Sequence, residues 1–253
     1  MPQVASLPEY FLEKGYHNPE DAYNGPFQFN RQTKDHYFEW MAKRPRDQEA
    51  FNTLMTISRM GRGENWFEFY PVEEKLKVQS PDDILLVDIG GGIGHDLIAL
   101  KEHFPGLQGR LIVEDLPAVA AAAKDLPPGI EAIGHDFFEP QPLSIKNAKA
   151  YYLRTVLHDW PNKESKLILE NIRKVMSKDS ILFLNENSIP DRNVPLFSCQ
   201  GDLTMMACFS ALDRTEQQFA DLLDSAGFRL VKVWRPKVIF PMSAVLFEAV
   251  IKD

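Results

Sequence analysis

The chain contains little cysteine and no long apolar segment, and each absence excludes a class of protein. Cys199 and Cys208 are the only cysteines among 253 residues. They are too few for a framework of disulfides, and neither belongs to a Cys-x-x-Cys or His/Cys pattern that binds zinc. No apolar run approaches the roughly 20 residues that span a bilayer, and the first residues lack the basic-then-apolar order of a secretory signal. We therefore expect a cytoplasmic protein that binds neither a metal nor a membrane.

Basic residues are also in the minority. The sequence has 28 lysines and arginines against 36 aspartates and glutamates, a net charge of -8, which argues against nucleic acid as a partner. Hydrophobic residues make up 44% and charged residues 25%, the composition of an ordinary globular protein. This length accommodates one large α/β domain, or a domain with an appendage, around a substantial core.

The sequence changes in character near residue 80. Before that point, aromatic and charged residues follow helical spacing, as in residues 35–60, and no strand is predicted. After it, short β-branched runs alternate with helical patterns. The predicted strands are 84–89, 110–114, 130–134, 149–156, 181–185, 229–234 and 244–251. The predicted helices are 94–103, 117–124, 163–177 and 215–226. We therefore divide the chain into a helical N-terminal segment, residues 1–80, and an α/β domain, residues 81–253.

The alternation of strands and helices predicts a doubly wound parallel sheet. The last two predicted strands are separated by only about ten residues, too few for a helical crossover, so they should pair antiparallel. The expected fold is therefore an α/β sheet, mostly parallel with an antiparallel last strand, that carries an N-terminal helical appendage.

The first predicted strand runs into a cluster of glycines, in "LLVDIGGGIGHDL" (residues 85–97). Asp88 stands at the end of the strand, Gly90 to Gly94 form the turn, and the next helix begins near Gly94. The spacing matches neither G-x-G-x-x-G nor a P-loop. A tight turn needs no other explanation, because glycine is the usual residue where φ is positive. Ligands of open α/β sheets, however, bind beyond the carboxyl ends of the strands, at such turns.

Acidic residues end the next two predicted strands. Glu114 and Asp115 follow the glycines by about 20 residues, the distance at which a carboxylate can bind both hydroxyls of a ribose. Asp136 ends the third strand, with Phe137 beside it to face a base. Capping of strand ends is the alternative explanation, since aspartate is common there. The order of the three strand ends favours a nucleoside cofactor.

Several longer motifs share one pattern. They are "LVDIGGGIGHD" (86–96), "EDLPAV" (114–119), "GHDFFEP" (134–140), "LRTVLHDWPNKESKLILENI" (153–172), "NENSIP" (185–190) and "LDRTEQQFADLLDSAGF" (212–228). Together they resemble S-adenosylmethionine-dependent methyltransferases, and more closely the caffeic-acid-type O-methyltransferase family of plants and fungi. The resemblance extends almost continuously from residue 85 to the C-terminus, and "HDW" followed by "RTEQQF" is its most specific part. It implies a Rossmann-like class I methyltransferase fold.

The resemblance implies S-adenosyl-L-methionine as cofactor. The glycines would let the backbone lie against its methionyl part, Asp115 would bind the ribose, and Asp136 and Phe137 would flank the adenine. Arg154 stands where the family usually has lysine, near the adenine. The implied cofactor-binding residues are Asp88, Gly90, Gly92, Glu114, Asp115, Leu116, Asp136, Phe137 and Arg154.

Methylation of a phenol requires a base to remove the hydroxyl proton, and histidine suits this role because its unperturbed pKa lies near neutrality. His158 follows the fourth predicted strand, where a substrate would meet the methyl group. The resemblance assigns Glu186 and Asp213 to flank this imidazole, although the family usually has glutamate at the position of Asp213. Alternatively, the segment simply begins a helix, with Asp159 as its cap and Trp160 in the core.

Three residues are candidates for a substrate pocket: Met205, Met206 and Trp160. Methionine adapts to flat aromatic ligands, but the methionines in "DLTMMACF" (202–209) fit a plain helix core equally well.

The leading function is therefore an S-adenosylmethionine-dependent O-methyltransferase that acts on an aromatic or polyketide-like small molecule. A pericyclase or isomerase on the same fold, and a non-catalytic partner subunit, are the alternatives. Family members normally begin with a helical dimerisation domain, of which residues 1–80 keep only the connecting helices. The chain is thus either a fragment or a naturally shortened protein, and residues 1–80 are the expected contact with a second copy or another chain.

Overall fold

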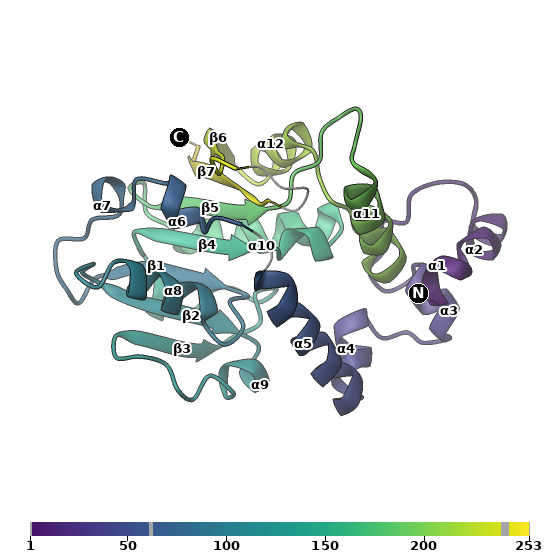
Figure 1. The fold of residues 1–253 in the computed structure, drawn as a ribbon, viewed down its shortest axis with the longest axis horizontal. Coiled ribbons are helices and arrows are strands. Elements are labelled where there is room, and N and C mark those ends of the chain that lie inside the picture. Colours follow the sequence, from purple (N-terminus) through teal and green to yellow (C-terminus); the bar gives the residue numbers. More distant parts are fainter. Residues whose placement is uncertain (1, 61–62, 239–242, 253) are drawn as a thin grey trace.

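A seven-stranded sheet forms the centre of the computed structural model, which describes residues 2–60, 63–238 and 243–252 (Figure 1). Each strand coincides with one of the apolar, β-branched runs of the sequence, within one residue at either end in every case but the fourth strand, which ends two residues early, at Arg154. The strands are β1 (Ile84–Ile89), β2 (Arg110–Asp115), β3 (Ile130–Gly134), β4 (Ala150–Arg154), β5 (Ile181–Glu186), β6 (Phe228–Trp234) and β7 (Val245–Ile251).

The strand order is β3-β2-β1-β4-β5-β7-β6. β1 pairs in parallel with both β2 and β4, β2 pairs in parallel with β3, and β4 with β5. β7 is inserted between β5 and β6 and runs antiparallel to both. The predicted fold class, including the antiparallel last strand, is therefore confirmed.

Helices cover both faces of the sheet. The four predicted in the α/β domain are present as α8 (His95–His103), α9 (Pro117–Ala120), α10 (Asn162–Val175) and α12 (Glu216–Ser225). On β1, Val87 packs with α10 and α12, while its neighbour Leu86 packs against α8. Because both faces are covered, every residue of β1 from Leu85 to Ile89 is buried, as in central parallel strands generally.

A fifth helix of this domain, α11 (Leu196–Phe209), was not among the helices predicted from spacing, although a helix core was one interpretation of residues 202–209. Its sequence, "LFSCQGDLTMMACF", spreads apolar residues around the whole helix instead of along one face. The three-and-four spacing that marks an amphipathic helix is therefore missing. Only its last residues, Ala207 to Phe209, are fully buried.

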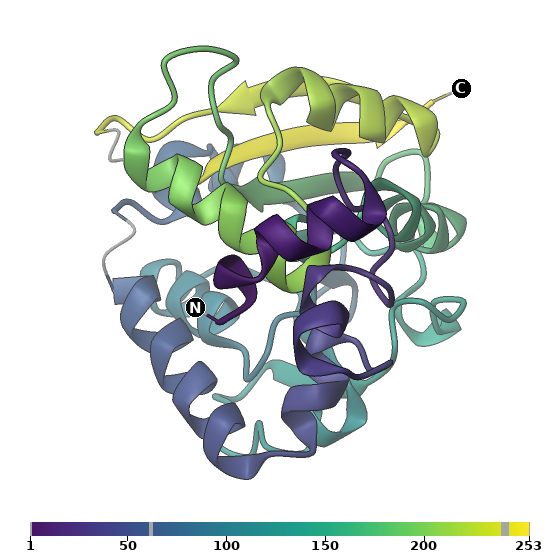
Figure 2. The ribbon, with the colours of Figure 1, turned by 90° about the vertical axis from the view of Figure 1, so that its right-hand side faces the viewer.

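The described part of residues 1–80 is helical and contains no strand, as the sequence predicts. Its helices are α1 (Pro2–Ala5), α2 (Leu7–Lys14), α3 (Pro26–Arg31), α4 (Tyr37–Ala42), α5 (Pro45–Met60), α6 (Trp66–Phe69) and α7 (Val72–Lys75). α1 to α5 gather with α11 beyond the carboxyl ends of the parallel strands, and Figure 2 looks onto this edge. α6 and α7 lie against the sheet itself, where Trp66 packs beside Tyr152 and Phe183.

The apolar residues of α4 and α5 differ in burial. Phe38 packs against the core and Met41 is buried. Leu54, Met55 and Ile57 are 57%, 40% and 61% exposed. We call these three side chains the exposed face of α5.

His36 joins the N-terminal helices to the α/β domain. Its ring stacks on Trp160 with centroids 4.3 Å apart and planes at 14°. Its Nδ1 accepts a hydrogen bond from the backbone N–H of Phe38, which caps α4. Burial lowers the pKa of His36 to about 4, so the ring is neutral and keeps this acceptor. The segment before the sheet is thereby held against the loop that follows β4.

Candidate active site

The glycine turn after β1 needs its first three glycines for two different reasons. Gly90 and Gly92 have φ of +71° and +63°, a region that side chains rarely adopt. A Cβ atom on Gly91 would lie 2.5 Å from the carboxylate carbon of Asp88. A Cβ atom on Gly92 would meet nothing within 4 Å. The turn is therefore packed against the protein on one side and open at Gly92 on the other.

Asp115 ties this turn to the end of β2. One carboxylate oxygen accepts the N–H of Gly92 at 2.8 Å, and the other accepts the N–H of Leu116 at 2.8 Å. Burial raises the pKa of Asp115, and the two N–H groups oppose that effect. Each oxygen keeps a lone pair for a further donor. The first two predicted strand ends thus form one acceptor site beside an open glycine backbone.

The third strand end lies next to the first. A ring carbon of Phe137 is 3.8 Å from the position of a Cβ on Gly90. Asp136 is exposed, and its carboxylate accepts the N–H of Phe138 at 3.0 Å in a local turn. The structure therefore brings together the glycines, Asp115 and Phe137.

Glu114 and Arg154, two further predicted cofactor residues, have polar partners within the protein. Glu114 is 1% exposed and accepts a hydrogen bond from Gln141 in the core. Successive residues of a strand point to opposite faces, so Glu114 does not share the side of Asp115. The Arg154 guanidinium forms an ion pair with Asp96 at 2.6 Å, in the first turn of α8. Leu116 contributes its backbone N–H to Asp115, and its side chain is exposed.

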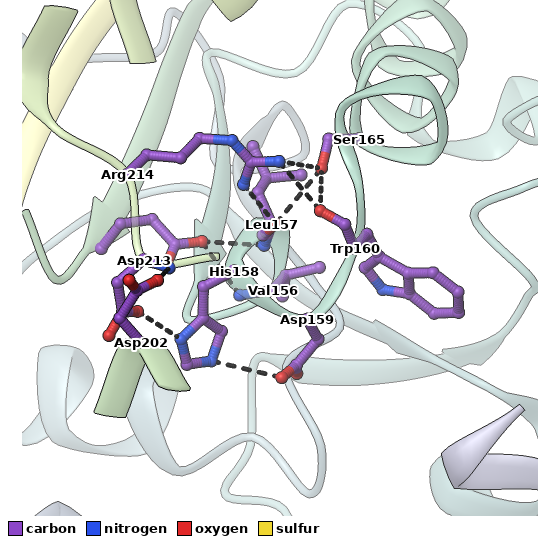
Figure 3. A network of polar contacts seen from close by, with 10 residues as sticks. Val156, Leu157, His158, Asp159, Trp160, Ser165, Asp202, Asp213 and Arg214 are labelled. Carbon is purple, nitrogen blue, oxygen red and sulfur yellow. Dashed lines mark hydrogen bonds and ion pairs between the residues drawn. The ribbon is translucent and has the colours of Figure 1, made fainter. Parts of the chain in front are cut away.

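His158 lies in a short 3₁₀ helix, Leu157–Asp159, just after β4. Its Nδ1 is 3.2 Å from a carboxylate oxygen of Asp213, and its Nε2 is 3.5 Å from one of Asp159 (Figure 3). Burial opposes the charged ring, but Asp159, Asp213 and Glu186 outweigh burial and raise the pKa of His158 to about 9. Only 14% of the side chain is exposed.

The side chain of Glu186 holds the backbone of the segment that carries His158. One carboxylate oxygen accepts the N–H groups of Val156 and Leu157, at 3.0 and 2.8 Å. Burial raises the pKa of Glu186 to about 6. The structure therefore brings Glu186 close to His158, but as a holder of the main chain rather than through a hydrogen bond to the ring.

Asp159 is the carboxylate that the sequence analysis did not place at the site. The only signal for it was its position beside His158. The alternative in which Asp159 caps the next helix is wrong, because α10 begins at Asn162 with Pro161 as its N-cap. Trp160 is buried in the core cluster and stacked on His36, which matches the core interpretation better than the substrate one.

The two methionines differ in surroundings. Met205 packs against the small cluster of Cys208, Phe209 and Ala211, and Met206 is half-buried. On the same helix, the Asp202 carboxylate accepts the backbone N–H of Asp213 at 3.0 Å. α11 therefore supports the residue that holds the imidazole, whichever interpretation of the methionines applies.

A family model described as an O-methyltransferase domain matches residues 22–229 of the chain. The chain belongs to this O-methyltransferase family. A methyltransferase of Aspergillus candidus, cfoC, is 40% identical over 240 residues, which are 92% of this chain and 58% of that protein. The chain thus spans less than two thirds of the length of this relative.

Solved structures resemble the chain over almost its whole length. One is named "A Pericyclic Reaction enzyme", and another is a complex of LepI with SAM. Each is 32% identical, superposes with a TM-score of 0.90, and is matched over 99% of this chain and 64% of its own.

Two surface cavities, of about 700 and 430 Å³, lie away from the site described above. The first is lined by α6, α7 and the end of α8, and the second by α2 and α3 with their loops. Among the described residues, no group of three or more histidines, cysteines or acids is arranged to hold a metal. Within the same ranges, no helix has the length and apolar character to cross a membrane.

Glu114 should make this O-methyltransferase domain less stable as the pH rises. Burial raises its pKa from 4.5 to about 7, so the folded state keeps a proton that the unfolded state has lost. The stability present below pH 4.5 is then lost as the pH passes 7, by about 3 kcal/mol. Glu114→Gln, whose amide still accepts from Gln141, should abolish this loss. Urea unfolding at pH 5 and pH 8 measures it.

Glu131→Gln is the control, because Glu131 lies on the neighbouring strand and its pKa is lowered by Arg110. This control should keep the wild-type loss between the two pH values. Parallel pH curves for wild type and Glu114→Gln would contradict the prediction.

Proposed function

We propose that the protein is an S-adenosylmethionine-dependent O-methyltransferase that acts on an aromatic or polyketide-like small molecule, with His158 as general base. The contact between the glycine turn and the segment of His158 carries this proposal. A Cβ on Gly90 would lie 2.9 Å from a methyl carbon of Val156, two residues before His158. The residues suited to the cofactor and the residue suited to the base are therefore neighbours.

The residues at the strand ends fit S-adenosylmethionine. Asp115 can accept two ribose hydroxyls, the aromatic ring of Phe137 can lie against a base, and the backbone at Gly92 is open to close approach. A relative at 32% identity has been solved with SAM, which supports the assignment. When bound, this cofactor supplies an electrophilic methyl group on a sulfonium.

His158 and its two aspartates define the path of the proton. A neutral ring that donates its Nδ1–H to Asp213 leaves the lone pair of Nε2 for the acceptor hydroxyl. In the structure, Asp159 lies on that side of the ring. An acceptor that replaces Asp159 at Nε2 removes one of the charges that favour the imidazolium, and the pKa of the ring falls. The ring then takes the phenolic proton, and Asp213 and Glu186 stabilise the imidazolium.

A pericyclase or isomerase is the second candidate. The solved structure named "A Pericyclic Reaction enzyme", with its TM-score of 0.90, supports it. In that case the acids around His158 would polarise a substrate without methylating it. Mass spectrometry separates the two, because methylation adds one CH₂ to the product mass and isomerisation adds nothing.

Asp115→Ala should weaken the binding of S-adenosylmethionine or its demethylated product. Loss of two charge-assisted hydrogen bonds costs on the order of 2–3 kcal/mol, which is about 30–150-fold in Kd. Titration calorimetry measures the change. Asp125→Ala, at an exposed acid after α9, is the matched control and should bind as wild type does. No detectable heat from wild type with either ligand at millimolar concentration would overturn the cofactor assignment.

His158→Ala should lower kcat about 10²–10⁴-fold and leave cofactor affinity nearly unchanged. With a pKa of about 9 in the free protein, kcat/KM of wild type should rise with pH up to about that value, since only the neutral ring accepts a proton. A panel of phenols and radiolabelled cofactor provide the assay. His17→Ala, at an exposed histidine, is the control.

Two further variants test the carboxylates. Glu186→Gln should cost less than His158→Ala, because the amide oxygen still accepts a backbone N–H. Asp213→Glu restores the side chain usual in the family and should be neutral or mildly activating. Full methylation by His158→Ala at neutral pH would show that the acceptor is already ionised or that another group is the base.

We also propose that residues 1–80 contact a second copy or another chain through the exposed face of α5. Three neighbouring apolar side chains in water are unfavourable, and covering them would stabilise the helix. Light scattering should show a dimer or larger species that Leu54→Asp with Ile57→Asp converts to monomer. A wild type that is monomeric at high concentration would exclude self-association.

A further inference from the structure

Arg214 is a fully buried arginine in the connection between α11 and α12. Its guanidinium donates to the carbonyl oxygen of Leu157 at 2.6 Å and to that of Trp160 at 2.9 Å. These two carbonyls lie on either side of His158 and Asp159 in the sequence. Figure 3 shows the guanidinium reaching into this segment from the side opposite the imidazole.

The same guanidinium also holds the start of α10. Nε and Nη2 donate to the amide oxygen of Asn162, at 3.0 and 2.9 Å, and Nη2 lies 3.3 Å from the hydroxyl of Ser165. That hydroxyl is itself within hydrogen-bond reach of the carbonyls of Leu157 and Trp160. A planar fork of donors can serve four such partners at once, which a lysine ammonium cannot do in this geometry.

The residue before Arg214 holds the imidazole itself. Asp213 contacts Nδ1 of His158, and the backbone around it is fixed on both sides. Its N–H donates to Asp202, and the carbonyl of Arg214 accepts from Ile189 at 3.2 Å. Two consecutive residues therefore fix the ring of the base and the main chain that carries it.

The charge of Arg214 has no contacting counter-ion, since none of the ion pairs formed by the described residues includes it. Its hydrogen-bond partners are all neutral. Burial lowers the pKa of Arg214 to about 10, and the carboxylates of Glu186 and Asp213 oppose this across space. A buried cation without a contacting partner is costly, and apolar side chains would fill the same volume more cheaply. We therefore look for the role of Arg214 in the geometry that its hydrogen bonds impose on the neighbouring residues.

We propose that Arg214 is a positioning residue, which holds the main chain on both sides of His158 so that the imidazole stays in contact with Asp213 and Asp159. This rests on the proposed role of His158 as general base. Arg214 acts through the carbonyls of Leu157 and Trp160 and does not touch the reacting atoms.

Arg214→Lys in the full chain tests the proposal, because it keeps the charge and removes the fork. NMR titration of the His158 ring is the first measurement. A released ring loses Asp213 and Asp159, so its pKa should fall from the wild-type value toward 6.5 by at least about one unit. Turnover is the second: kcat should fall by about 10–100-fold, the effect of a displacement near 1 Å, with KM and cofactor affinity little changed.

Phe228→Leu is the matched control. Phe228 is a fully buried residue of β6, and its truncation lowers stability while every hydrogen bond of Arg214 to the segment of His158 keeps its partners. If Arg214→Lys only destabilises, its folded fraction should titrate like this control, and the proposal is overturned. Arg214→Met removes the positive charge together with the fork. Loss of the charge alone would raise the pKa of His158, so a pKa that rises or stays unchanged in this variant also overturns the proposal.

If Arg214→Lys does not fold, two further variants test the proposal. Asn162→Ala removes one partner of the arginine, and Ser165→Ala removes another together with the bonds of its own hydroxyl to the carbonyls of Leu157 and Trp160. Both variants leave the arginine in place and should shift the His158 titration in the same direction by less. No shift in either would contradict the proposal. The titration needs no turnover, so it still decides the role of Arg214 if wild type methylates no phenol, a result that would reject only the proposed function.

Discussion

The parallel pairing of β1 with both β2 and β4 is the constraint on which the rest of the candidate site depends. Three strands that run in one direction deliver three loops to one edge of the sheet. The glycine turn, Asp115 and His158 therefore meet without any long excursion of the chain. Their separation in sequence is large, but their separation in space is set by the spacing of neighbouring strands. The hydrogen bond from Gly92 to Asp115 then fixes the turn to the second strand.

Much of the fold was predictable because central parallel strands are apolar on both faces. Such a run, like residues 84–89, stands out in the sequence and has the same bounds in the structure. α11 was not predictable in the same way, because its apolar residues do not segregate to one side. The burial of α11 depends on the elements that surround it in the fold, and the local sequence pattern does not reveal which elements these are. The stack of His36 on Trp160 could not be predicted for the same reason, because it joins segments that are far apart in the sequence.

For the site, the sequence located the strand ends but not the direction of each side chain. Glu114 and Asp115 are adjacent and chemically alike, yet the pleat of the strand sends one into the core and the other to the glycine turn. Glu186 was assigned to the imidazole, but its carboxylate satisfies backbone N–H groups that would otherwise be buried without partners. The resemblance to the family supplied the residues, and the hydrogen-bonding needs of the main chain decided what some of them contact.

The adjacency of Asp213 and Arg214 places a limit on how the chain can vary in length. The connection from α11 to α12 spans residues 210–215 and delivers one side chain to the ring of His158 and the next to its main chain. Inserting or deleting one residue there would shift both contacts out of register together. The connection from β5 to α11 is more exposed at residues 190–195, beyond Ile189, whose N–H donates to the carbonyl of Arg214. Loop exchanges among members of this family are therefore expected to succeed in the second connection and to fail in the first.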